Sequence, residues 1–469
     1  MEFDKKIGDD VKRLIGDVVL LHEGTYLYCD SAYFYSGTNS VDAYGKVRIT
    51  SSSVTITGKV LNYNGNTKTA DLHQDVRMTD GKMVLTTNHL TYNTKSNIGN
   101  YTTGGKITDP ENVLTSTIGY YYADDKLFYF KKNVVLVNPR YTMKSDTLKY
   151  NTDTEISYFY GPTTIVSKEN LIYCENGWYD TKNDIAQFNK NAYFTNKEQK
   201  LYGDSLYYDR KLGFGKAFNN ITAIDTVQRI TMKGNYAEYH EKIGKTMITK
   251  KAMLIQDIDG DSLFLHADTL KAFFDTTKEG KAAGKTLFAY KHAKFFKSDL
   301  QGLSDSIVYS FKDSTIFMYT SPLLWSDKNQ LSADTIKIFL SNNQIKQMNL
   351  YASSFIVIKD DSVRYNQVKG RNLVGHFTDN KLRKINVYGN GETHYYVRDE
   401  KQKLVGVNKA TAEDLVIFVD KNEIHSITFL SKPEATLYPE KDLAPNDVKL
   451  KGFKWEEAKR PASEKDIFR

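Results

Sequence analysis

The sequence predicts an all-β protein: one array of about thirteen stacked repeats, each made of bent antiparallel strands. Three observations support this. A segment recurs every 29 residues, apolar residues alternate with a period of two, and bend-forming residues occupy fixed places in each repeat. The 33 Tyr and 24 Phe point the same way, because aromatic residues favour strands.

The repeat is easiest to follow from one polar position, which we call the anchor and number zero. Seven anchors are spaced 29 residues apart: Asp30, Lys59, Asn88, Thr117, Asp146, Glu175 and Asp204. Similar segments continue at wider intervals, with anchors at Gly234, Asp268, Asp305, Asp334, Gly370 and Glu413. Wider intervals are expected where hairpin tips accept insertions.

Apolar residues take alternate positions within a repeat, as in strands with one buried face. Three before the anchor stand Leu27, Ile56, Leu85, Leu114, Met143, Ile172 and Leu201. One before it, every residue is small: Cys29, Gly58, Thr87, Ser116, Ser145, Cys174 and Gly203. Positions +2, +13, +17 and +19 supply the inner-face residues Leu61, Leu90, Leu148, Leu206, Phe130, Phe159, Phe188, Val47, Val76, Val134, Ile49, Met78, Leu136 and Phe194.

The alternation breaks twice in each repeat. At the anchor the apolar parity changes, which requires a bend or a bulge. Around positions +15 and +16 stand the bend formers Gly45, Asp75, Gly104, Asn133, Gly161-Pro162, Asn191 and Asn220. Polar turns such as YNTDTE and YDTKND lie between the two breaks. We therefore expect two long strands per repeat, each bent near its middle, stacked into a V-shaped or flattened tube with an apolar inner face.

The domain organisation follows from the repeat. We expect a continuous array over residues 1–442, with regular 29-residue units at about 27–225 and longer units at 226–442. Residues 443–469 lack the strand pattern and are expected to form a cap or a disordered tail. Leu14–Leu20 fits the second half of a unit, so we expect an export signal upstream of Met1, with or without further repeat.

Several classes of function are disfavoured. The net charge of +7 comes without a Lys/Arg cluster, which argues against nucleic-acid binding. No apolar run reaches the roughly 18 residues of a membrane-spanning helix. No G-x-S-x-G, P-loop or G-x-G-x-x-G motif stands in a strand-to-helix context, and no HExxH is present. We therefore expect no enzyme activity, no cofactor and no metal site.

Two local features suggest a site but have simpler explanations. Cys29 and Cys174 occupy the same small position five repeats apart, too far for a disulfide, and are expected to be core residues. Asp257, Asp259 and Asp261 resemble part of a calcium loop. The glycine and glutamate of an EF-hand are missing, so a hairpin turn is favoured.

The recurring lines CDSAYFY…AYGKVRI, SDTLKYN…FYGPTTI and GDSLYYD…AFNNITA resemble the OstA-like family of lipopolysaccharide-transport proteins, which includes LptA and the N-terminal domain of LptD. The segment from Arg13 to Ile49 looks especially like the long OstA-like proteins of the Bacteroidetes branch. The resemblance spans about residues 13–440. It implies an elongated β-jellyroll (β-taco) whose interior receives lipid A acyl chains.

The resemblance implies a periplasmic bridge that shields lipopolysaccharide acyl chains during transport to the outer membrane. The fourteen inner-face residues would then line a lipid groove. Other Lpt-type proteins would bind by edge-strand pairing at either end. The alternative is a structural or adhesive β-solenoid with a filled core, which binds protein or glycan on its surface.

The aromatic residues leave two roles open. Phe130, Phe159 and Phe188 repeat at one position and could contact acyl chains or pack against each other. The tyrosines at position +4 favour a structural role: Tyr63, Tyr92, Tyr121, Tyr150, Tyr179 and Tyr208.

Overall fold

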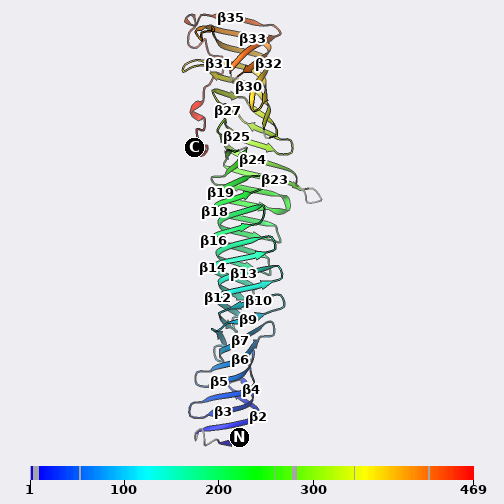
Figure 1. Cartoon of the computed structure of the whole chain (residues 1–469), viewed down its shortest axis with the longest axis vertical. Helices are drawn as coiled ribbons and strands as arrows, with labels where there is room; N and C mark the ends of the chain where they lie inside the picture. The colour runs from blue at the N-terminus through cyan, green and yellow to red at the C-terminus, as the bar shows by residue number, and fades with distance from the viewer. Residues whose placement is uncertain are drawn as a thin grey trace. The chain divides into compact units, whose positions relative to one another are not determined.

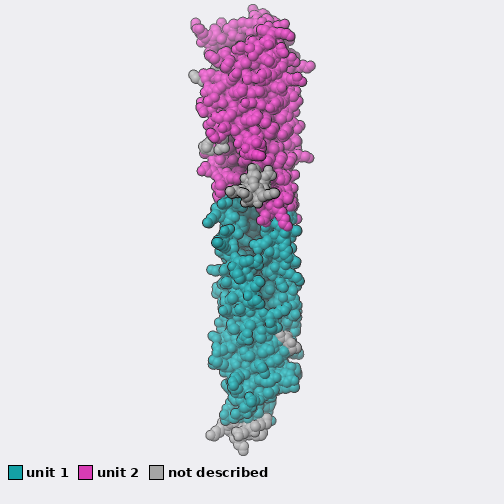
Figure 2. Space-filling model, turned by 90° about the vertical axis from the view of Figure 1, so that its right-hand side faces the viewer, with its two compact units in different colours: residues 1–215 teal, residues 216–469 magenta. Residues whose placement is uncertain are grey.

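The computed structural model describes residues 2–3, 10–51, 54–258, 260–276, 282–342, 344–420 and 423–469. The chain divides into two compact units, residues 1–215 and 216–469, coloured separately in Figure 2. Within the described ranges there are 35 strands, four single-turn 3-10 helices and no α-helix. The strand pairings given for them are antiparallel, which confirms the predicted all-β class.

Unit 1 is an antiparallel meander in which most strands pair with their neighbours in sequence (Figure 1). Its strands are β1 Glu2–Phe3, β2 Val11–His22, β3 Thr25–Tyr35, β4 Ser40–Thr50, β5 Thr55–Asn64, β6 Thr69–Thr79, β7 Val84–Asn93, β8 Ile98–Tyr101, β9 Gly105–Thr108, β10 Val113–Ser116, β11 Ile118–Tyr122, β12 Leu127–Asn138, β13 Tyr141–Asn151, β14 Ile156–Ser167, β15 Leu171–Asp180, β16 Ile185–Thr195 and β17 Gln199–Asp209.

Unit 2 follows the same antiparallel plan with longer strands near its end; β18 begins at the last two residues of unit 1. Its elements are β18 Phe214–Asp225, β19 Ile230–His240, η1 Glu241–Ile243, β20 Lys245–Thr249, β21 Met253–Ile258, β22 Asp261–His266, β23 Thr269–Thr276, β24 Ala282–Lys297, β25 Leu300–Ser310, β26 Thr315–Tyr319, β27 Leu323–Ser326, β28 Asn329–Ser332, β29 Thr335–Ser341, β30 Gln344–Lys359, β31 Tyr365–Thr378, β32 Lys381–Arg398, β33 Leu404–Asp420, β34 Glu423–Leu430, β35 Glu434–Tyr438, η2 Glu440–Asp442, η3 Glu457–Lys459 and η4 Asp466–Phe468.

Each repeat is folded into two arms. They are clearest in unit 1 where the bend splits the strands: β9 pairs with β10 in arm 1, which precedes the anchor, and β8 pairs with β11 in arm 2, which follows it. Elsewhere one strand runs through both arms. The strand turns that end the arms are the arm tips, and the bend between the arms is the corner.

The corner is a bulge in which one residue faces two. In β13 and β14, Ser145 pairs with Thr163 and Thr147 with Tyr160, so the anchor Asp146 faces both Gly161 and Pro162. Seven of the eight bend formers predicted from sequence, all except Pro162, have the positive φ of the left-handed region. At most corners two consecutive residues adopt it: Gly16/Asp17, Gly45/Lys46, Gln74/Asp75, Lys132/Asn133, Lys190/Asn191, Asn219/Asn220, Lys250/Lys251, Lys291/His292, Thr320/Ser321, Ala352/Ser353, Gly389/Asn390 and Ser431/Lys432.

Two of the thirteen anchors are displaced by one residue from the sequence prediction. The N–H of Asn235, not Gly234, donates to the corner carbonyl of Lys250. Likewise, Gly370 pairs with Ser354, which leaves Arg371 opposite the left-handed pair Ala352/Ser353. Both glycines therefore occupy the small position before the anchor. The insertions in unit 2 obscured this one-residue difference.

Residues 440–469, which we call the C-terminal strap, lie along the outer face of arm 1 in unit 2 (Figure 1). Two buried glutamines bind its backbone in both directions. Gln367 donates to the carbonyl of Val448 and accepts from the N–H of Leu450, both at 2.8 Å. Gln330 donates to the carbonyl of Lys454 at 2.8 Å and accepts from the N–H of Glu456 at 2.7 Å. These side chains replace the backbone of a neighbouring strand.

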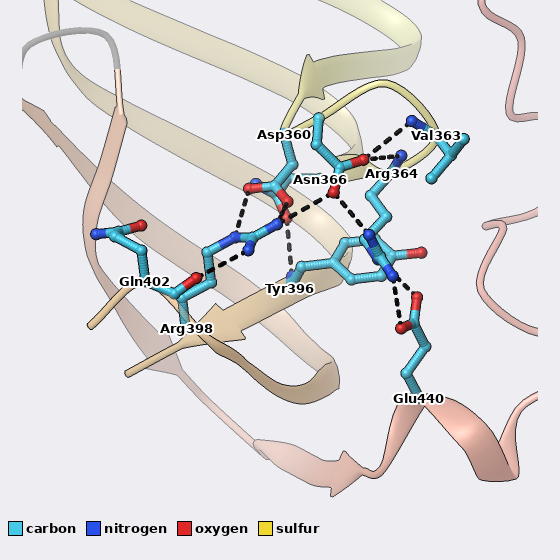
Figure 3. Close-up of polar contacts among 9 residues, drawn as sticks. Asp360, Val363, Arg364, Asn366, Tyr396, Arg398, Gln402 and Glu440 are labelled. Carbon is cyan, nitrogen blue, oxygen red and sulfur yellow. Dashed lines mark hydrogen bonds and ion pairs between the residues drawn. The ribbon is translucent and has the colours of Figure 1, made fainter. Parts of the chain in front are cut away.

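The strap is also held at its start and along an apolar stripe. Arg364 donates to both carboxylate oxygens of Glu440 at 2.7 and 2.8 Å and to Asp361 at 2.7 Å (Figure 3). The hydrogen bonds from Arg364 to Glu440 lower the pKa of the Glu440 carboxyl. Leu450 packs with Phe355 and Val357 in a small core cluster that Phe453 and Trp455 cover.

The left-handed corner residues generate a stability prediction. Asn133→Val places a β-branched side chain at φ 52° and should lower the free energy of unfolding by about 1–2 kcal/mol, measured by urea denaturation. Lys131→Val on the same strand is the matched control and should have little effect. Equal effects of the two substitutions would show that corner geometry does not limit stability.

The glutamine contacts generate a second prediction. Gln330→Ala leaves the carbonyl of Lys454 and the N–H of Glu456 without their partner, at a cost of about 1–3 kcal/mol. Trypsin should then cut the strap faster at Lys454 and Lys459. Gln344→Ala is the control, because the amide oxygen of Gln344 accepts a hydrogen bond from Lys346 at the surface. This variant should leave the cleavage rate unchanged. An unchanged rate in the Gln330 variant would contradict the role assigned to it.

Candidate functional site

The interior of unit 1 is lined by continuous rows of side chains that run across the strands. The arm-1 row is aliphatic except for one Phe. Successive members are direct cross-strand partners: Leu20, Leu27, Ile49, Ile56, Met78, Leu85, Ile107, Leu114, Leu136, Met143, Ile165, Ile172, Phe194 and Leu201. No polar residue interrupts this row between β2 and β17, where all its positions are described.

The arm-2 row lies on the other side of the corner and mixes aromatic, aliphatic and small residues. In chain order its members are Leu14, Ala32, Ala43, Leu61, Leu72, Leu90, Tyr101, Gly119, Phe130, Leu148, Phe159, Gly177, Phe188 and Leu206. A third row, the corner row, contains the small residues before each anchor and their partners at position +17.

The structure places all fourteen sequence-predicted residues on these three rows. Ile49, Met78, Leu136 and Phe194 belong to the arm-1 row. Val47, Val76 and Val134 belong to the corner row, and the other seven to the arm-2 row. Twelve of the fourteen are buried, whereas Leu136 and Phe194 are half-buried.

The hydroxyl-bearing side chains of the corner row turn back to their own strand. The hydroxyls of Thr87, Ser116 and Ser145 each donate to the carbonyl two residues ahead, at 3.2, 3.0 and 3.0 Å. Ser304 in unit 2 makes the same contact at 3.0 Å. These bonds satisfy carbonyls that the bulge removes from the strand pairing, so buried hydroxyls are tolerated at the corner.

Aromatic rings in the arm-2 row lie over glycines on the next strand. A Cβ on Gly119 would stand 2.4 Å from the ring of Tyr101, and a Cβ on Gly177 would stand 2.4 Å from the ring of Phe159. The rings of Phe159 and Phe188 stack with centroids 6.1 Å apart. Phe159 and Phe188 therefore pack against each other, whereas the ring of Phe130 stacks on Phe128 at 5.5 Å.

The six repeated tyrosines form a fourth row nearer the arm-2 tips, where they alternate with residues such as Ala70, Gly99 and Ala186. The hydroxyl of Tyr92 donates to Asn97 at 3.0 Å, and that of Tyr179 donates to Asp184 at 2.7 Å. Both acceptors lie in the adjoining hairpin turn. The expected structural role of these two tyrosines is confirmed.

Contacts between the arm tips close the interior over β2–β11. Lys68 in an arm-2 tip pairs with Glu23 in an arm-1 tip at 2.5 Å, and the hydroxyl of Tyr63 lies 2.9 Å from His22. Further along, Tyr121 of arm 2 donates to Asp80 of arm 1 at 3.1 Å. The interior behind these contacts is packed: Met78 and Tyr92 have no exposed surface.

The interior loosens over β14–β17. There the arm-1 row residues Ile165, Ile172, Phe194 and Leu201 are all half-buried. The interior near the corner stays packed in the same strands: Thr163 and Cys174 of the corner row and Phe159 of the arm-2 row are at most 1 % exposed. The arms therefore separate from their tips inward while the corner stays packed.

Sequence reasoning missed part of this lining. Ile172 and Leu201 were recognised as apolar residues three before the anchor but were not included in the predicted lining. Ile165 was not named, although it follows the +19 spacing that would have identified it. The cross-arm contacts between Lys68 and Glu23 and between Tyr121 and Asp80 join residues 45 and 41 positions apart. No local pattern marks such pairs.

The alternative chemistries find little support. Both cysteines are buried and free, as predicted. The QDIDGDS segment is a hairpin between β21 and β22, as expected, with Asp259 outside the described residues. The described part of the chain contains no group of three or more His, Cys, Asp or Glu arranged to hold a metal. None of its helices is long and apolar enough to cross a membrane.

Comparison with known proteins gives one family. Residues 1–146 and 142–204 match the family described as OstA-like protein. Among solved structures, the chain is similar to LptH, the LptA-homologous periplasmic component of the conserved lipopolysaccharide transport device of Pseudomonas aeruginosa. The identity is 14%, the TM-score is 0.21, and the alignment covers 22% of this chain and 79% of that chain. No curated protein matches the sequence.

Burial of the corner row generates a prediction about thiol reactivity. Burial raises the pKa of the Cys174 thiol to about 12 and also raises that of Cys29. At pH 8 both should therefore be protonated and unreactive. A chromogenic disulfide reagent should modify both only after denaturation. Rapid modification of native protein at pH 8 would contradict the packed corner.

Proposed function

We propose that this chain, whose residues 1–204 match the OstA-like family, is a periplasmic carrier that shields lipopolysaccharide acyl chains on their way to the outer membrane. The observation that carries the proposal is the unbroken apolar arm-1 row across β2–β17. Burying acyl CH₂ groups gains about 0.8 kcal/mol each, so a chain of about twelve carbons gains roughly 10 kcal/mol.

The uniform side chains of the arm-1 row would allow an acyl chain to move as well as to bind. Each strand presents a side chain of similar size and polarity to the arm-1 row, so a chain that advances by one strand exchanges one aliphatic contact for another. The ligand then has a nearly level energy path. Directed motion would come from a ligand pushed in behind, with no chemistry in this chain.

The fourteen inner-face residues are the proposed lining, and their burial divides them. Leu136 and Phe194 are half-buried and can be reached without rearrangement. The other twelve are packed, so a ligand reaches them only if the arms separate. Saccharide and phosphate groups would stay in solvent beyond the arm tips.

Partners would bind by strand addition. The first and last strands of such an array expose backbone N–H and C=O groups, which an OstA-like domain of another protein can extend. We place the chain in the periplasm with Lpt-type proteins as partners, because this is what the family resemblance implies.

One observation favours a second candidate, a structural β-solenoid with a filled core. Over β4–β7 the interior side chains Ile49, Ile56, Met78 and Leu85 are at most 2 % exposed. A core packed this tightly is complete without a ligand. A filled core does not explain why the residues of the arm-1 row are only half-buried over β14–β17.

A matched pair of neighbouring aromatic residues on β16 tests the proposal. Phe194 faces the interior, whereas Tyr193 stacks between Tyr173 and Tyr202 on the outer face, at 5.2 and 5.8 Å. With p-benzoylphenylalanine at position 194, irradiation in the presence of lipopolysaccharide should give a covalent adduct. The same photoprobe at position 193 should give none. Equal or absent labelling at the two positions would favour the filled solenoid.

A further inference from the structure

We propose that acyl chains enter the interior sideways, through a window between the arm tips of β14–β17. The window consists of the inner residues Ile165, Ile172, Phe194 and Leu201 and the lip residues Ser167, Asn170, Asn196 and Gln199. The inference rests on the proposed lipid-carrying function and assigns that function a place and a direction.

The first argument compares equivalent positions along one row. Ile49, Ile56 and Met78 are at most 1 % exposed, whereas Ile172, Phe194 and Leu201 occupy the same row and are half-buried. Side-chain size does not explain the difference, because Phe is larger than Met and yet fails to fill the space. The difference lies in the separation of the arms.

The second argument is the chemistry of the lip. Five residues before the anchor, where the chain reaches the arm-1 tip, the second and third repeats carry Val54 and Met83, which are 3 % and 4 % exposed, between the half-buried Thr25 and Asn112 of the first and fourth. The equivalent residues in β15 and β17 are Asn170, which is half-buried, and Gln199, which is exposed. The apolar side chains of Val54 and Met83 are thus replaced by amides at the window. These amides can donate hydrogen bonds to phosphate and sugar oxygens while acyl chains lie inside.

The third argument is what holds the mouth shut elsewhere. Lys68 with Glu23 and Tyr121 with Asp80 join the two arms over β2–β11. The same repeat position bridges the arms at Tyr63 and Tyr121 but is used within one hairpin at Tyr92 and Tyr179. The bridging tyrosines Tyr63 and Tyr121 therefore lie in β5 and β11, outside the window.

A time-resolved labelling experiment on the unmodified chain tests the window. The probe is a lipopolysaccharide with a diazirine in an acyl chain, and adducts are mapped by peptide mass spectrometry after irradiation at successive times. Adducts should appear first at Ile165, Ile172, Phe194 and Leu201. Labelling of Ile49, Ile56 and Met78 should be roughly tenfold lower at the earliest times.

Two adjacent substitutions on β17 supply the control. Leu201→Glu puts a charge inside the window and should reduce total interior labelling roughly tenfold, because an unpaired carboxylate disfavours an apolar ligand. Lys200→Glu makes the same residue at an exposed neighbouring position and should leave labelling unchanged. Thermal unfolding of both variants checks that each is folded.

The outcomes separate the two proposals. Early labelling confined to the window supports it. Equal labelling along the whole arm-1 row, or labelling that starts near Ile49, would contradict the proposed entry window but not the proposed lipid-carrying function. Interior positions that never label overturn the proposed function itself.

Discussion

The structure depends on one backbone constraint, the corner where a single anchor residue faces two residues on the neighbouring strand. The extra residue takes a left-handed conformation that strands do not contain, so every strand of the stack must bend at the same place. A bend in one strand alone would break the pairing on both sides. Aligned corners preserve the pairing and fold each repeat into two facing arms.

The inner rows follow from this constraint. Close to the corner the arms are too near each other for large side chains, which explains the small residues before each anchor and their hydroxyl contacts with local carbonyls. Two residues further out there is room for Leu, Ile, Met or Phe. Because the corners are in register, these side chains meet their equivalents on the next strand and form continuous apolar rows.

The arms themselves are not fixed by the corner, and here the two halves of unit 1 differ. Over β4–β7 the rows pack closely, and Val54 and Met83 are buried at the arm-1 tips. The contacts between the arm tips join the arms there, but the ion pair of the half-buried Lys68 with the exposed Glu23 adds little energy, because water weakens such charge pairs. Apolar packing therefore supplies most of the energy that closes the interior, and this packing is looser over β14–β17. Unit 2 stabilises its arm 1 in another way, by covering the outer face with the strap.

The sequence by itself determined the strands, the 29-residue repeat, the bend formers and the fourteen inward residues. All of these depend on local periodicity, which survives in a one-dimensional pattern. Where insertions interrupt that periodicity the sequence was less reliable, and the anchors near Gly234 and Gly370 were displaced by one residue. Only the tertiary structure decided which part of the interior is packed and which is half-exposed. It alone showed that Gln330 and Gln367 bind the strap. These features depend on contacts between residues about 40 or more positions apart, such as Tyr121 with Asp80, and such contacts exist only after the arms have folded together.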